Sequence, residues 1–160
     1  MLTSLDQHKD TVKGLHLDLS QSNVTSACIP KLLDSINSCK SLISIGLDMG
    51  DGEGITADSL NEVMTAITTG EHQLASLALG FHNSQVLSDN EFNNIFGAIV
   101  SKKDTLKMLR LNFSNTTLTA QSLEIMVYCL SELSLDHLEL FLGGNTCVDD
   151  AFLMKLGEVI

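Results

Sequence analysis

The sequence predicts an α/β solenoid in which a parallel β-sheet is backed by a row of α-helices. Two observations lead to this prediction. One pattern of aliphatic residues recurs five times along the chain, and each copy is followed by apolar residues at helical spacing. The copies start 30, 32, 32 and 29 residues apart, at Val12, Leu42, Leu74, Leu106 and Leu135. A period in this range is typical of solenoids, whose repeats bury their apolar sides by stacking on one another.

The first part of each repeat is a predicted strand. Its first, fourth, sixth and eighth positions are apolar in all five copies: Val12/Leu15/Leu17/Leu19, Leu42/Ile45/Leu47/Met49, Leu74/Leu77/Leu79/Phe81, Leu106/Leu109/Leu111/Phe113 and Leu135/Leu138/Leu140/Leu142. Because successive side chains of a strand point to opposite faces, we expect the third, fifth and seventh positions to face away from the core.

The second part of each repeat is a predicted helix, with apolar residues at steps of three, four and seven on one stripe. In the last copy this stripe includes Leu153 and ends at Ile160. A capping residue precedes each predicted helix: Thr25, Thr56, Ser88, Thr119 and Asp149. Ser88 and Glu91 fit a capping box. Pro30 would remove a hydrogen bond inside a helix, so we expect the first helix to start late, with Pro30 in its first turn.

The repeats resemble leucine-rich repeats, in the long-repeat branch typified by ribonuclease-inhibitor-like proteins. The resemblance covers nearly the whole chain, from Val12 to Ile160. It implies a horseshoe with the sheet on the concave face and, usually, protein–protein recognition. The family usually has Asn or Cys at the ninth position, where the side chain satisfies backbone groups of the turn. Here Asn83 and Asn115 come one position later, so we expect looser turns, and the ninth position holds Ser20, Gly50, His82, Ser114 and Gly143.

We expect residues 1–160 to form a single leucine-rich-repeat domain, with residues 1–11 as the end of a preceding helix or the N-terminal edge. Solenoids need terminal caps with a polar outer face, and neither end of this sequence carries one. We therefore expect further repeats or neighbouring subunits at both ends.

The composition limits which classes of partner and which cellular compartment we expect for the protein. The formal net charge of −11 disfavours nucleic acid and anionic lipid and favours basic partners. No apolar run approaches the ~20 residues needed to cross a membrane, and the first ten residues lack the apolar core of a secretory signal. The four cysteines show neither CxxC nor Cys/His metal spacing, so we expect free thiols in an intracellular, cytoplasmic protein. We expect no metal and no cofactor.

The candidate binding residues lie at the outward strand positions of the concave face. In the middle repeats Gly46, Ala78 and Gly80 are small, so we expect a partner to approach the backbone closely there. The last two repeats carry larger outward residues: Met108, Arg110, Asn112, His137, Glu139 and Phe141. Arginine and aromatic residues are enriched among interface hot spots, so this group is predicted to anchor a partner. The alternative is that Arg110 pairs with Glu139 on the next strand, about 5 Å away, and that Phe141 packs under a loop.

Asp18 and Asp48 occupy the same position of adjacent strands, and His16 lies nearby. These carboxylates suit a lysine from a partner, a cation, or a solvated acidic edge, and the three interpretations stay open. The segment from Asp48 to Glu53 lacks the residue order of a calcium loop, so we expect a glycine-rich turn. Three further histidines are expected to be isolated surface or loop residues: His8, His72 and His82.

The sequence contains no motif for a nucleophile elbow, a zinc protease or a phosphate-binding loop, so we predict no catalytic residue. The predicted function is a non-enzymatic interaction or scaffolding module, within a larger cytoskeletal, ciliary or organellar assembly. The alternative is a regulator of an enzyme, because some relatives stimulate small GTPases or inhibit nucleases. For that alternative Arg110, the sole arginine of the chain, is the candidate catalytic arginine.

Overall fold

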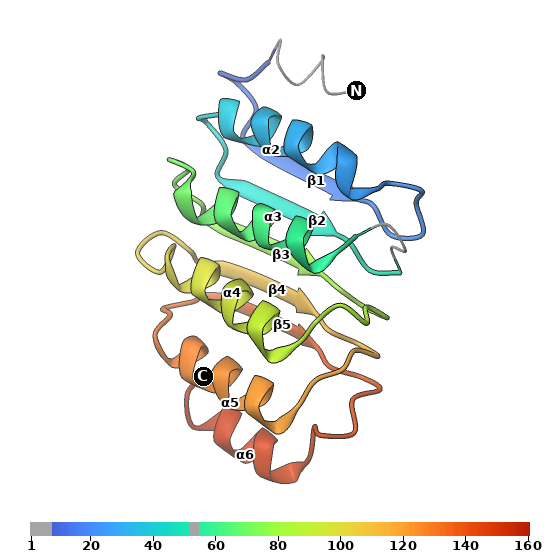
Figure 1. Ribbon diagram of the computed structural model, residues 1–160. Coiled ribbons are helices and arrows are strands. Elements are labelled where there is room, and N and C mark those ends of the chain that lie inside the picture. The colour runs from blue at the N-terminus through green and yellow to red at the C-terminus, as the bar shows by residue number, and fades with distance from the viewer. Residues whose placement is uncertain (1–7, 52–54) are drawn as a thin grey trace.

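The computed structural model describes residues 8–51 and 55–160 and has the predicted α/β architecture (Figure 1). The strands are β1 (Gly14–Asp18), β2 (Ser44–Asp48), β3 (Ser76–Gly80), β4 (Met108–Asn112) and β5 (His137–Phe141). The helices are α2 (Ile29–Ser38), α3 (Ala57–Thr69), α4 (Asp89–Val100), α5 (Ala120–Ser131) and α6 (Asp150–Gly157), with a 3₁₀ turn η1 (Ser26–Cys28) before α2. Figure 1 shows the helices in a row along one side of the sheet.

The strands pair in parallel and in sequence order, from β1 to β5. Equivalent positions of neighbouring repeats pair with one another, as Leu15 does with Ile45 and Ile45 with Leu77. This register keeps every apolar position on the helix side, because a slip of one residue would turn the whole set outward.

The core lies between the sheet and the helices and is centred on phenylalanine rings. The ring of Phe113 lies 4.8 Å from that of Phe92 and 5.5 Å from that of Phe81 between centroids. Phe96 completes the group, and all four side chains are almost fully buried. Burial of such a side chain stabilises a fold by roughly 1.5–3 kcal/mol, so this cluster joins the third and fourth repeats.

Four of the five predicted helix caps are confirmed: Thr56, Ser88, Thr119 and Asp149 each accept a hydrogen bond from a first-turn N–H group. The predicted capping box of Ser88 and Glu91 is also present. The prediction for Thr25 is wrong in part, because Thr25 precedes η1 and makes no side-chain capping bond. Helix α2 starts late with Pro30 in its first turn, as expected, because proline fits where no N–H is needed.

The last helix differs from the prediction. Helix α6 ends at Gly157, so Ile160 lies outside it, and Leu153 is 53% exposed. Phe152 and Leu156 are the buried residues of this helix. Because α6 packs against α5 alone among the described helices, only one of its sides is covered.

Two predictions concern residues outside the described ranges. The expected helix end in residues 1–7 lies there, and so does part of the turn from Asp48 to Glu53. Among the described residues, no helix combines the length and apolar character that a membrane span requires.

Candidate functional site

The outward strand positions form three rows across the open face of the sheet, meaning the face away from the helices. Strand register defines the third-position row of Gly14, Ser44, Ser76, Met108 and His137. It also defines the fifth-position row of His16, Gly46, Ala78, Arg110 and Glu139, and the seventh-position row of Asp18, Asp48, Gly80, Asn112 and Phe141. All eleven predicted binding residues therefore share one face.

At one end of this face lies the C-terminal cluster, defined as Met108, Arg110, His137, Glu139 and Phe141. Arg110 Nη1 lies 3.2 Å from Glu139 Oε2, and its guanidinium carbon lies 4.9 Å from the centroid of the Phe141 ring. His137 Nε2 lies 2.8 Å from Glu139 Oε1. The bond from His137, followed by the charge of Arg110, lowers the pKa of Glu139, so this carboxylate stays ionised.

The side chains of the C-terminal cluster remain open to solvent. Met108 is 48% exposed and Phe141 is 39% exposed, and the Arg110 side chain is 60% exposed. The alternative pairing of Arg110 with Glu139 is thus confirmed, whereas burial of Phe141 under a loop is wrong. The ion pair orders Arg110 without covering its aromatic and aliphatic neighbours.

The middle of the open face is less bare than its sequence predicts. Gly46 and Gly80 are buried. The His16 ring occupies the space next to Gly46, and a Cβ at Gly80 would lie 2.5 Å from the Asp48 carboxylate. The prediction that a partner approaches the backbone at Gly46 and Gly80 is therefore wrong. Each glycine makes room for the side chain of the preceding strand, which lies across it.

A hollow of about 430 Å³ runs over the open face from β1 to β4. Ala78 lies at its middle and remains half-exposed. Asp18 and Asp48 line the end at β1 and β2, and Arg110 lines the end at β4. The hollow therefore has two carboxylates at one end and, at the other, an arginine that is paired with Glu139.

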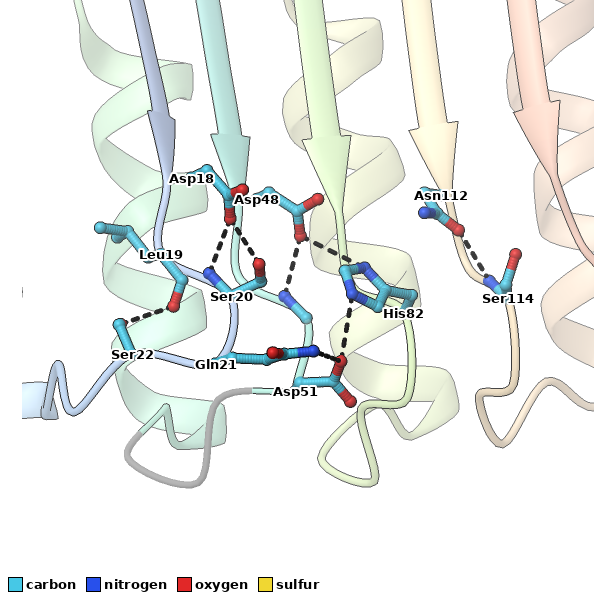
Figure 2. A network of polar contacts seen from close by, with 11 residues as sticks. Asp18, Leu19, Ser20, Gln21, Ser22, Asp48, Asp51, His82, Asn112 and Ser114 are labelled. Carbon is cyan, nitrogen blue, oxygen red and sulfur yellow. Dashed lines mark hydrogen bonds and ion pairs between the residues drawn. The ribbon is translucent and has the colours of Figure 1, made fainter.

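The seventh-position side chains close the turns that follow the strands (Figure 2). Asp18 Oδ1 accepts a hydrogen bond from the Ser20 amide at 3.0 Å. In the second repeat, Asp48 Oδ1 accepts the equivalent bond from the Gly50 amide, also at 3.0 Å. Asn112 Oδ1 accepts from the Ser114 amide at 3.1 Å. Bonds from the side chain and the backbone of Ser20 lower the pKa of Asp18. Both carboxylates are thus fixed in position, and the lowered pKa of Asp18 keeps that carboxylate ionised.

The five turns share one backbone feature. The tenth position of every repeat is left-handed, with φ between 51° and 79°: Gln21, Asp51, Asn83, Asn115 and Gly144. Glycine, asparagine and aspartate tolerate this conformation best. The asparagines that follow the ninth position therefore supply a backbone conformation.

His82 links the turn that follows β3 to the turn that follows β2. Its Nδ1 lies 3.3 Å from Asp48 Oδ1, and its Nε2 lies 3.3 Å from Asp51 Oδ2 (Figure 2). Gln21 Nε2 also donates to Asp51 Oδ2, at 3.4 Å. The prediction of an isolated His82 is wrong. Across the described residues, no three histidine, cysteine or acidic side chains are arranged to hold a metal ion.

His72 is the second histidine that the sequence analysis placed wrongly. It is only 2% exposed, and neither ring nitrogen has a hydrogen-bond partner in the described part of the chain. Burial, and then the nearby charge of Lys102, lower the pKa of His72, so the ring is neutral. Lys102 is itself held by the carbonyl oxygens of Thr68 and Gly70, at 3.3 and 2.8 Å from its Nζ. His72 is therefore a residue of the repeat interior.

The architecture resembles a solved structure over nearly its whole length. The chain is similar to the tropomodulin C-terminal domain of Caenorhabditis elegans, with a TM-score of 0.68, 13% identity, and coverage of 99% of this chain and 90% of that one. The fold is a leucine-rich-repeat solenoid. An internalin of Listeria monocytogenes str. 4b F2365 is matched with a TM-score of 0.39, 14% identity, and coverage of 93% of this chain and 46% of that one. No protein-family model and no curated protein matches the chain.

The leucine-rich repeats carry a polar position that the sequence analysis missed. At the eleventh position, Ser22 Oγ donates to the Leu19 carbonyl at 2.6 Å, and Thr116 Oγ1 donates to the Phe113 carbonyl at 2.8 Å. Asn145 Nδ2 donates to the Phe113 carbonyl at 2.8 Å and to the Leu142 carbonyl, just after β5, at 2.9 Å. The role expected of a ninth-position asparagine thus falls to the eleventh position, where small polar residues recur in the sequence.

Proposed function

We propose that this chain is a protein-interaction module that binds protein partners through the open face of its sheet. The observation that supports this proposal most is the C-terminal cluster. Met108 and Arg110 on β4 and Phe141 on β5 are exposed on adjacent strands of one face, and the Arg110 guanidinium lies over the Phe141 ring. Arginine and aromatic side chains dominate binding energy at protein interfaces, particularly where apolar surface surrounds them.

The internal contacts of the cluster favour binding. The Arg110 side chain is held by Glu139 and by the Phe141 ring, so less conformational entropy is lost when a partner binds. The same contacts hold Arg110 against its own sheet, which supports an anchoring role over that of a catalytic arginine in an enzyme regulator.

We further propose that the module is a scaffolding subunit of a larger assembly, with neighbours at both ends of the sheet. Apolar residues of β1 and β5, such as Leu15 and Leu138, are half-buried, whereas their equivalents Ile45, Leu77 and Leu109 are almost fully buried. An added repeat or subunit on either edge would cover them. The repeat length supports the long-repeat branch, and four free cysteines support a cytoplasmic location, where thiols stay reduced.

A quantitative pulldown from cytoplasmic extract tests the interaction proposal. The Arg110→Ala/Phe141→Ala variant is expected to lose most of the proteins recovered by the wild-type chain, because both anchors are removed. Tyr128→Ala/Lys155→Ala is a matched control, because it removes one exposed aromatic and one cation from the helix side. Equal recovery by the wild-type and Arg110→Ala/Phe141→Ala chains would contradict the proposal, as would equal losses from both variants.

A further inference from the structure

The hollow of the open face differs in chemistry between its two ends. Asp18 and Asp48 line its end at β1 and β2, and no lysine or arginine of the described residues lies in salt-bridge distance of either. Arg110 lines its end at β4, and its guanidinium carbon lies 4.9 Å from the centroid of the exposed Phe141 ring on β5. A ligand that crosses the strands therefore meets two carboxylates at one end and, at the other, an ion-paired arginine beside an exposed aromatic ring.

The two carboxylates each have an oxygen atom that is available to a cationic ligand. Each uses Oδ1 for its turn, and in the described part of the chain Oδ2 of Asp18 and of Asp48 makes no hydrogen bond. Figure 2 shows the second oxygen of each pointing away from the turn. Because the turn amides fix both side chains, a bound cation would not have to order them.

We propose that the hollow binds an extended segment of a partner protein, with a lysine or arginine side chain at Asp18 and Asp48 and an apolar side chain at Phe141, which lies in the same seventh-position row. This proposal rests on the proposed function, since it names the chemistry of the partner at the same face. A volume of about 430 Å³ suits a few side chains of a segment. Half-exposed Ala78 leaves room for the backbone to cross.

Strand geometry sets the spacing of the two recognised side chains. Strands lie about 4.8 Å apart, so three strand intervals separate the two ends by about 14 Å. An extended chain spans about 3.4 Å per residue, which places the basic and apolar residues about four positions apart. Glu139, the carboxylate at the other end, is already paired with Arg110 and bonded to His137, so the basic residue is assigned to Asp18 and Asp48.

A selection of random peptides, roughly ten residues long so that they cross the sheet, tests this inference. Peptides selected on the wild-type chain are expected to carry lysine or arginine about four positions from a leucine, isoleucine, phenylalanine or methionine. Selection on Asp18→Asn/Asp48→Asn is expected to lose the basic preference and keep the apolar one. A synthetic peptide from the first selection should bind the variant about tenfold more weakly.

The substitutions Asp18→Asn and Asp48→Asn introduce the residue that the fourth repeat already has at this position. Asn112 holds the same position and makes the same turn bond, so asparagine at positions 18 and 48 removes charge and keeps the acceptor. Asp104→Asn/Glu158→Gln makes the same change in net charge away from the open face and should retain the basic preference.

Three results would overturn the inference: no enriched peptide on the wild-type chain, no basic preference in the enriched peptides, or a basic preference that survives in Asp18→Asn/Asp48→Asn. If Arg110→Ala/Phe141→Ala still loses protein partners in those cases, the proposed function stands and only the extended basic segment is rejected. If the peptides behave as expected and the pulldown shows no loss, the hollow binds such segments, but the proposed anchoring of protein partners by Arg110 and Phe141 is rejected.

Discussion

The imidazole ring of His82 lies against Gly50, in the space that a side chain at position 50 would occupy. The contact joins the turn of the second repeat to that of the third. Asp48 Oδ1, which accepts the Gly50 amide at 3.0 Å, also lies 3.3 Å from His82 Nδ1. One repeat thus supplies the side chain that completes the turn of its neighbour, in a fold whose repeats are stabilised by their neighbours.

The contact between these residues predicts that Gly50→Ala destabilises the protein by about 1–3 kcal/mol, because the added methyl overlaps the His82 ring. Gly50 is not left-handed, so backbone strain does not contribute. In a His82→Ala background the same substitution should cost much less. Urea unfolding of the four proteins gives the coupling energy as a double-mutant cycle, and an equal cost in both backgrounds would refute the contact as its cause.

The turn bonds of the seventh position predict different effects of two substitutions at Asp48. Asp48→Ala should lower the free energy of unfolding by about 1 kcal/mol, because the Gly50 amide loses its acceptor. Asp48→Asn should change it by less than about 0.5 kcal/mol, since Asn112 makes the equivalent bond in the fourth repeat. Chemical denaturation of both variants checks this, and equal losses would show that the charge of Asp48 matters more than its acceptor.

The sequence was sufficient to predict the strands, their register and the helix side of the sheet. These features follow from apolar periodicity, and a one-residue slip at Ile45 or Leu77 would expose the core. The same periodicity placed Leu153 wrongly. The residues at the equivalent helix position of other repeats, such as Leu60 and Phe92, are buried. Their helices have a following helix beside them, whereas α6 has only α5 beside it in the described structure.

The sequence predicted which positions form the candidate site, but it did not predict the conformations of their side chains. A glycine such as Gly46 or Gly80 leaves space, and the sequence does not show that His16 or Asp48 fills it. Rotamer choice depends on the neighbouring strand, which periodicity does not describe. The capping boxes of Thr56 and Thr119 were not predicted, because serine replaces the usual Glu or Gln at the third residue of each helix.

The phenylalanine cluster predicts that folding and binding can be separated by mutation. Phe113→Ala should destabilise the protein by about 3–5 kcal/mol, because the ring is buried among three others. Phe141→Ala should cost less than about 1 kcal/mol, because its ring remains partly exposed. Thermal unfolding of the two variants tests the difference. A large loss for Phe141→Ala would mean that its effect on partner recovery reflects folding.

The burial of His72 predicts a loss of stability in mild acid. Burial, followed by the charge of Lys102, lowers the pKa of His72 in the folded state, whereas in the unfolded chain it is about 6.5. The unfolded state therefore binds the proton more readily, and the free energy of unfolding should fall as the pH drops below about 6.5 towards the folded pKa. His72→Leu should remove this component, and exposed His8→Leu should keep it. Urea unfolding at about pH 7.5 and about pH 5.5 measures the difference, and an unchanged pH dependence in His72→Leu would assign the loss to other groups.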